Sequence, residues 1–307
     1  LMDQIIAAVP NICEGTDETF IDEITTRLRG IARLIGLDVA MDHARNRTVF
    51  SFTGTKEAIF DGGLALYEQA LERIDMRHHF GEFPRVGAVD VFPFVPLKNA
   101  TMKQAKEWAD EFAELVAERF KLPVYLYAES ARYRYRRDVD NIRQGEYEGF
   151  EAKMHDQRWK PDLGPDRFPA ASGVTIIGAR YPLLSFNVFL GSRDESIADK
   201  VAHEIADTSG GIVRAHGALD PDTERAMLSV AITNFKASPL YRTIENIRLE
   251  ADRYGVNIRR VELIGLVPER VLLQAAEYYL RIHDFDRNNL LEKTIQRHID
   301  KSFVFGD

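Results

Sequence analysis

The residues best suited to acid–base chemistry lie at positions 76–82, in a segment that contains consecutive histidines and a glutamate. The segment has no helical period and precedes an apolar, strand-like stretch at residues 89–92, so we expect a loop at the edge of a sheet. A histidine such as His79 usually titrates near neutral pH, and the pKa of a desolvated glutamate such as Glu82 can be raised toward it. Both are therefore candidates for proton transfer. The alternative is that the histidines are solvated or cap backbone carbonyl groups.

Two arginines, Arg47 and Arg85, each stand in an apolar stretch of the sequence. A fixed guanidinium group in such a place binds a substrate carboxylate through two hydrogen bonds. The alternative is a structural ion pair with Glu14 or Asp90. Glu14 follows the first predicted strand, at the end where ligand-facing loops often lie, and it can equally cap the next helix.

Residue types for metal or disulfide chemistry are scarce. Cys13 is the single cysteine, which excludes an intrachain disulfide and a multi-cysteine metal cage and fits a reducing compartment. His78, His79 and Glu82 make a poor metal site, because consecutive histidines rarely bind one ion and the sequence offers no further ligand nearby. We expect no metal.

Composition places the chain among packed proteins of enzyme size. Its 307 residues are 45% apolar and 29% charged, near the averages for globular proteins. The net charge of −8 argues against nucleic-acid binding, which usually needs a basic face. No apolar run approaches the roughly 20 residues that cross a bilayer, and the N-terminus lacks the basic start of a signal peptide. We expect a cytoplasmic protein that acts on a small molecule and binds neither nucleic acid nor membrane.

The spacing of apolar residues predicts the elements that position these side chains. Strands are expected at residues 5–9, 35–39, 48–52, 89–92, 124–127, 184–190, 212–215, 227–232 and 261–266. Helices are expected from residue 16 or 17 to about 31, at 56–74, from 101 to about 116, and at 195–208, 240–254 and 269–282. Thr101 and Gln104 have the spacing of a capping box at the third of these helices.

The order strand, helix, strand, strand, helix, strand occurs twice, which indicates an α/β (α+β) fold. We expect two tandem two-layer subdomains, each a mixed sheet with helices on one face and a ferredoxin-like βαββαβ core. The subdomains are predicted at residues 1–179 and 180–299, followed by a tail at 300–307. Residues 132–172 have weak periodicity and several Pro and Gly residues, which predicts a long, structured, functional connection.

Short motifs recur in a fixed order along the chain. They include Val-Pro-Asn at 9–11, Glu-Gly at 14–15, Asn-Arg-Thr-Val at 46–49, Ile-Asp-Met at 74–76, Gly-Glu at 81–82, Pro-Arg at 84–85, Asp-Val at 90–91, Gly-Glu-Tyr-Glu at 145–148, Phe-Asn at 186–187 and Gly-Leu-Val-Pro at 265–268. Together they resemble the glutamate formiminotransferase (formimidoyltransferase) domain family, over about residues 4–285. The cyclodeaminase half that is fused to this domain in mammalian relatives has no counterpart here, so the resemblance is to a stand-alone domain.

The resemblance implies a transferase. The family moves a formimino group from N-formiminoglutamate to the N5 nitrogen of tetrahydrofolate, a step in histidine degradation. It therefore implies tetrahydrofolate as co-substrate, formiminoglutamate as donor, no metal, and a homodimer. We assign substrate binding to Asn11, Glu14, Arg47 and Arg85.

One segment matches the family stretch that contacts folate. Its residues are Gly164, Pro165, Asp166, Arg167, Phe168, Pro169, Ala170, Ala171, Ser172 and Gly173. Backbone exposed by glycine can hydrogen-bond the pterin. Arg167 is not a usual member of this stretch, and Ser172 stands where a relative has an aromatic residue.

The family's catalytic histidine is replaced here by Phe83, in the loop Gly-Glu-Phe-Pro-Arg at 81–85. A phenylalanine cannot carry a proton, and three explanations are open. His79 or Glu82 can have taken over proton transfer. The protein can instead catalyse a related one-carbon reaction with another donor or acceptor. It can also bind folate without catalysis, with Phe83 as an apolar wall. Ala40, where many family members are acidic, is a second departure.

Overall fold

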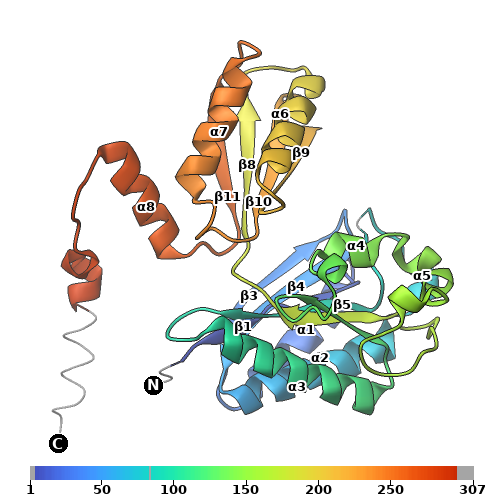
Figure 1. Cartoon of the computed structure of the whole chain (residues 1–307). Coiled ribbons are helices and arrows are strands. Elements are labelled where there is room, and N and C mark those ends of the chain that lie inside the picture. The colour runs from blue at the N-terminus through green and yellow to red at the C-terminus, as the bar shows by residue number, and fades with distance from the viewer. Residues whose placement is uncertain (1–3, 83, 296–307) are drawn as a thin grey trace, which may run out of the picture. The chain divides into compact units, whose positions relative to one another are not determined.

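The computed structural model describes residues 4–82 and 84–295 (Figure 1). Phe83 and the expected tail at 300–307 lie outside the described residues. The chain divides between Pro182 and Leu183 into two compact units. Each unit is described by itself below.

The first unit is built on the expected βαββαβ core. Its elements are β1 (Ile6–Ala8), β2 (Asn11–Ile12), α1 (Glu18–Arg29), β3 (Leu34–Asp42), β4 (Arg47–Gly54), α2 (Lys56–Arg73) and β5 (Val89–Pro96). Strands β1 and β2 lie end to end between β4 and β5, and both pair antiparallel with these two strands. Strand β3 pairs with the other side of β4.

Two parallel strands extend this sheet beyond β5. They are β6 (Val124–Ala128), reached through α3 (Met102–Phe120), and β7 (Thr175–Ala179), which lies between β5 and β6. The sequence predicts β6 and α3, including the capping box of Thr101 and Gln104. It does not predict β7, because every residue of this five-residue strand is buried and no alternation of polar and apolar residues marks it. The first sheet is mixed, as expected.

Helices cover both faces of the first sheet, which corrects the expectation of helices on one face. Helices α1, α2 and α3 lie on one side, and α4 (Val139–Arg143) and α5 (Glu146–Met154) lie on the other (Figure 1). The physical reason is in β5, where neighbouring residues that point to opposite faces, Val91 and Phe92, are both apolar. Phe92 packs on Phe112 of α3, with ring centroids 4.5 Å apart, whereas Val91 joins a cluster with Phe150 of α5.

Short 3-10 turns occur in the connections of this unit, at η1 (Met76–His78), η2 (Arg134–Arg136) and η3 (Gln157–Trp159). The connection at residues 132–172, for which the sequence predicts no regular element, therefore holds α4 and α5 as well as two of these turns. Arg136 anchors it: its buried guanidinium group pairs with Asp162 at 2.7 Å and lies over the ring of Tyr133.

The second unit is an antiparallel sheet with helices on one face. Its elements are β8 (Leu184–Leu190), α6 (Glu195–Thr208), β9 (Val213–Leu219), β10 (Ala226–Ile232), α7 (Leu240–Asp252) and β11 (Ile258–Ile264), followed by α8 (Glu269–Leu280) and η4 (Arg287–Asn289). The strand order is β11-β8-β10-β9, and each of these pairings is antiparallel. The expectation of a mixed sheet is wrong for this unit. Strand β10 lies between the parallel-running strands β8 and β9, and β8 lies between the parallel-running strands β10 and β11, so parallel strands never pair.

Three segments of the first unit lead to one place. Strand β2 ends at Ile12, the turn at residues 43–46 joins β3 to β4, and the loop at residues 74–88 enters β5. Because β2 pairs with both β4 and β5, the end of β2 lies beside the start of β4 and the start of β5. Polar side chains at the end of β2 and at the starts of β4 and β5 are therefore brought together.

Candidate functional site

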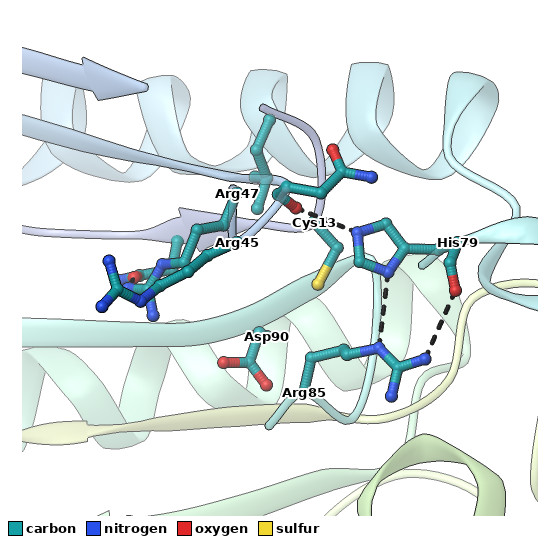
Figure 2. Close-up of a pocket in the computed structure, with 9 residues that line it drawn as sticks. Cys13, Arg45, Arg47, His79, Arg85 and Asp90 are labelled. Atoms are coloured by element: carbon teal, nitrogen blue, oxygen red, sulfur yellow. Dashed lines mark hydrogen bonds between the residues drawn. The ribbon is translucent and has the colours of Figure 1, made fainter. Parts of the chain in front are cut away.

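A pocket lies where these three segments meet (Figure 2). It is lined by Asn11 and Ile12 of β2 and by Cys13, which follows it. Arg45, Asn46 and Arg47 line it from the turn and the start of β4, and His79, Arg85 and Asp90 from the loop and β5. Of the residues that the sequence singles out for substrate or proton transfer, the pocket gathers Asn11, Arg47, His79 and Arg85.

His79 uses both of its ring nitrogens. It is 8% exposed, its Nε2 donates to the backbone oxygen of Asn46 at 2.9 Å, and its Nδ1 accepts from Nε of Arg85 at 3.4 Å. The roles follow from Arg85, whose Nε–H can only donate, so the imidazole proton is on Nε2. Burial lowers the pKa of His79, the hydrogen bond to Asn46 opposes the shift, and the charge of Arg85 adds to it. The imidazole is therefore neutral at pH 7.

Arg85 is saturated with hydrogen-bond acceptors. Its Nη1 donates to Glu146 at 3.0 Å and to Glu148 at 2.8 Å, and its Nη2 donates to Glu148 at 2.6 Å and to the backbone oxygen of His79 at 3.3 Å. With Nε on His79, each N–H group has a partner. Burial would lower the pKa of Arg85, but the hydrogen bond and charge of Glu148 outweigh it and raise the pKa.

The ion-pair alternative for Arg85 is thus realised with other partners than those the sequence suggests. Glu146 and Glu148 belong to the first turn of α5, on a segment about 60 residues further along the chain. Their side chains are 46% and 62% exposed, whereas that of Arg85 is 7% exposed. A substrate carboxylate can reach this guanidinium only by displacing one of them.

Asp90 binds both the loop before β5 and helix α4. One carboxylate oxygen accepts from the backbone N–H of Val86 at 3.0 Å, and the other accepts from Nη2 of Arg143 in α4. Both side chains of this ion pair are nearly inaccessible, at 4% and 7% exposed. Burial would lower the pKa of Arg143, and the Asp90 carboxylate raises it instead. Asp90 thus links the loop to α4.

Arg47 and Asn11 lie together on the pocket wall. Nη2 of Arg47 donates to Oδ1 of Asn11, whose Nδ2 donates to the backbone oxygen of Val9 at 3.2 Å. Burial lowers the pKa of Arg47, partly opposed by the charge of Asp90. The guanidinium group is still cationic at neutral pH, because an arginine keeps its proton far above pH 7.

The helix-capping alternative for Glu14 is wrong, because the N-cap of α1 is Asp17, and Glu14 instead stabilises the turn before the helix. Its Oε1 accepts from the backbone N–H groups of Thr16 at 2.7 Å and Asp17 at 2.9 Å, just before α1 begins. Burial would raise the pKa of Glu14, and these hydrogen bonds outweigh it and lower the pKa. Its side chain does not line the pocket among the residues that the structure describes.

The end of the predicted folate segment lies beside the loop at 74–88. Backbone N–H groups of Met76 and Ala88 donate to the oxygens of Ala171 and Ser172, each at 2.8 Å. Gly87 and Gly173 pair in an isolated bridge, and a Cβ on Gly87 would lie 2.0 Å from the backbone oxygen of Val174. Glycine is required at this close approach.

The start of the same segment lies elsewhere. Gly164 and Pro165 line a separate surface hollow with Glu114, Glu118 and Lys121 at the end of α3. Asp166 pairs with Lys160 at 2.5 Å, and the Phe168 ring packs on Tyr147 with centroids 5.4 Å apart. Arg167, like Ala170, is exposed. The ten-residue stretch is therefore not one continuous wall of the pocket.

Five pocket residues were not predicted as site residues: Ile12, Cys13, Arg45, Asn46 and Asp90. Asn46 stands in the Asn-Arg-Thr-Val motif, which is a usable signal, whereas Arg45 has none. Cys13 donates its thiol proton to the backbone oxygen of Gly87 at 3.2 Å, and burial with the nearby Asp90 charge raises its pKa. A buried thiol of raised pKa is a poor nucleophile. Glu82 is exposed, in the same loop as His79.

Residues 4–82 and 84–295 contain neither a candidate metal site nor a candidate membrane-spanning helix. In that part of the chain, His, Cys, Asp and Glu side chains nowhere gather in a group of three that could hold a metal ion. No helix within it has the length and apolar character needed to cross a bilayer.

Comparisons with known proteins agree along the chain. A model of the N-terminal subdomain of the formiminotransferase domain matches residues 5–180, and a model of the formiminotransferase domain matches residues 185–300. A glutamate formimidoyltransferase of Streptococcus pyogenes serotype M1 is 38% identical over 93% of this chain and 96% of its own length. One of Thermoplasma acidophilum is 37% identical over 95% and 98%. The formimidoyltransferase-cyclodeaminase of Rattus norvegicus is 35% identical over 91% of this chain, which spans 53% of that relative.

Proposed function

The chain belongs to the formiminotransferase domain family, and on that premise we propose that it transfers the formimino group of N-formiminoglutamate to the N5 nitrogen of tetrahydrofolate. The observation that carries the proposal is the match to glutamate formimidoyltransferases over more than nine tenths of both chains. Tetrahydrofolate is then a co-substrate. The reaction serves histidine degradation, in the cytoplasm, and the working unit is a homodimer.

The reaction needs a group that moves protons. The folate nitrogen attacks the amidine carbon of the donor, and the nitrogen that leaves the tetrahedral intermediate must be protonated. His79 has no lone pair to offer while Nδ1 accepts from Arg85. Glu82 lies three residues further along the same loop; its side chain is exposed, so the desolvation that lets a glutamate hold a proton near neutral pH must come from the bound substrates. Of the two candidates we therefore place Glu82 first for proton transfer and assign His79 to holding the loop.

Carboxylate binding falls to Arg47. Formiminoglutamate brings carboxylate groups, and Arg47 is a cation of the pocket wall whose guanidinium group donates to the Asn11 amide. Arg85 is already paired with two glutamates. Asn11 orients the Arg47 guanidinium, and Glu14 supports the turn before α1. For the folate we assign contacts to Ala171, Ser172 and Gly173, the part of the predicted segment beside the loop, where the carbonyl oxygens of Ala171 and Ser172 each accept one backbone hydrogen bond and keep a second lone pair.

Turnover with formiminoglutamate and tetrahydrofolate tests the reaction and the ranking together. We expect product with the unmodified protein, a loss of about 100-fold or more in kcat for Glu82→Gln, and a smaller loss for His79→Gln, because removing a general acid–base group costs about 10²- to 10⁴-fold. Absence of product above background, with folate still bound, contradicts the transferase proposal. A larger loss for His79→Gln reverses the ranking.

A second candidate function is folate binding without catalysis, favoured by Phe83 at the family's histidine position. Phe83→His separates the two. If the unmodified protein lacks turnover and Phe83→His gains about 100-fold or more, the site has lost its proton-transfer group. If Phe83→His instead reduces an existing activity, Phe83 belongs to a working site.

A further inference from the structure

A chain of contacts joins an exposed carboxylate of α5 to the buried His79. Glu148 in the first turn of α5 holds both terminal nitrogens of Arg85, at 2.8 and 2.6 Å, and Arg85 holds His79 through Nε. We propose that Glu148 is a positioning residue of the transferase site: its two-point contact fixes the Arg85 guanidinium against Nδ1 of His79 and so keeps this imidazole in the form with its proton on Nε2. The role of Glu148 in the reaction rests on the proposed function. The contacts of Glu148, and the experiment that tests them, do not depend on that function.

The geometry of Glu148 distinguishes it from its neighbour. A carboxylate that accepts from both Nη1 and Nη2 fixes the plane of a guanidinium group and not only its position. Glu146 accepts from Nη1 alone, at 3.0 Å, so the Arg85 guanidinium group could still rotate about this single hydrogen bond. The direction in which Nε points therefore depends on Glu148.

The consequence for the loop follows from the two nitrogens of His79. Nε2 ties the loop to the backbone of Asn46, while Nδ1 ties it to Arg85. Gly81 lies between His79 and Glu82 in the sequence. A Cβ on Gly81 would lie 2.4 Å from the backbone oxygen of Arg45, so the loop approaches the β3–β4 turn closely here. The loop is thus packed against the β3–β4 turn. The contacts from Glu148 through Arg85 to His79, here called the clamp, determine the position of Glu82, the proposed proton-transfer group.

The ring of His79 lies among charges of both signs. Arg85 lies against Nδ1, and the carboxylates of Glu14 and Glu148 act on the ring from two other segments. The loss of Glu148 has opposite effects under two explanations. If Glu148 only offsets the charge of Arg85, its removal leaves the guanidinium in place and makes protonation of His79 harder. If Glu148 positions Arg85, its removal frees Nδ1 and makes protonation easier.

Nitrogen-15 NMR of the histidine rings in the full chain measures both which ring nitrogen of His79 carries the proton and the pKa of the ring. The His79 signal is assigned by its loss in His79→Gln. In the unmodified protein we expect a proton on Nε2 and none on Nδ1 at pH 7. In Glu148→Gln we expect the form with the proton on Nδ1 to appear and the pKa of His79 to rise by about one unit, a tenfold change in proton affinity. Glu146→Gln is the matched control, because it removes the same charge from the same guanidinium and leaves the two-point contact.

An unchanged or lowered pKa of His79 in Glu148→Gln overturns the proposal, and so does an equal rise in Glu146→Gln. Arg85→Lys provides a second route that keeps the charge and removes the planar group, and it is expected to release the ring in the same way. Retained circular dichroism shows that a variant is folded. Because the NMR measurement needs no substrate, failure of turnover counts against the proposed function alone, and failure of the ring signal counts against the clamp alone.

Discussion

The Nε2 atom of His79 lies 2.9 Å from the backbone oxygen of Asn46, and this hydrogen bond connects the loop before β5 to the turn between β3 and β4. Asn46 makes two further links: its Oδ1 accepts from the N–H of Gly15 and its Nδ2 donates to the oxygen of Phe80, each at 2.9 Å. Its φ of 46° is in the left-handed region, which asparagine tolerates better than most residues. One turn residue thus joins three segments of the site.

Substitutions of Asn46 separate its side chain from its backbone. We expect Asn46→Gly to lower the free energy of unfolding by about 1–3 kcal/mol, since two hydrogen bonds are lost. Asn46→Ala should cost about 1 kcal/mol more, because alanine resists the left-handed conformation. Urea denaturation of both variants checks this. Equal values for the two would mean that the backbone conformation contributes nothing.

Protonation of His79 should weaken the fold in acid. Burial holds the pKa of His79 below its unfolded value of about 6.5, so the unfolded chain binds this proton more readily than the folded one. Stability contributed by the neutral ring is present above about pH 6.5 and falls as the pH drops from there toward the folded pKa. The slope of unfolding free energy against pH, measured between pH 7 and 5, should be shallower in His79→Gln. An identical slope would contradict the shift.

The buried ion pair beneath the loop offers a matched comparison. Asp90→Asn leaves Arg143 charged and buried, and we expect a loss of about 3–5 kcal/mol in unfolding free energy. Asp140 approaches the same arginine at 3.9 Å but is 57% exposed, so Asp140→Asn should cost no more than about 1 kcal/mol. Thermal or urea unfolding distinguishes them. Similar losses for both would show that Asp90 is not the counter-ion on which Arg143 depends.

Two glycines of the same unit should respond oppositely to alanine. A Cβ on Gly87 would overlap the backbone oxygens of Val174 and Ser172, at 2.0 and 2.8 Å, so Gly87→Ala must separate the loop from the predicted folate segment. We expect a loss of about 2 kcal/mol or more in stability and weaker folate binding. Gly149 lies in α5 with open space around it, and Gly149→Ala should stabilise by about 0.5–1 kcal/mol. Calorimetry of unfolding and of folate binding tests both, and tolerance of Gly87→Ala would refute the close approach.

Local patterns in the sequence are sufficient for most elements of the fold. Apolar residues at helical spacing predict α1–α3 and α6–α8, and short apolar or alternating runs predict most strands. Where an element is short or has few apolar residues, the pattern is too weak to identify it. Strand β7 and the helices α4 and α5 were missed for that reason.

The site divides in the same way between sequence and structure. From residue type and motif alone, Asn11, Arg47, His79 and Arg85 were selected, and the structure places all four at one pocket. Which of them is free to react was decided only by tertiary structure. Arg85 meets Glu148 across 63 positions of sequence, and His79 meets Asn46 across 33, and no local rule predicts such partners. Because hydrogen bonding in a buried site depends on which chain segments meet, the sequence alone determined the kinds of group present, and the fold decided their protonation and their partners.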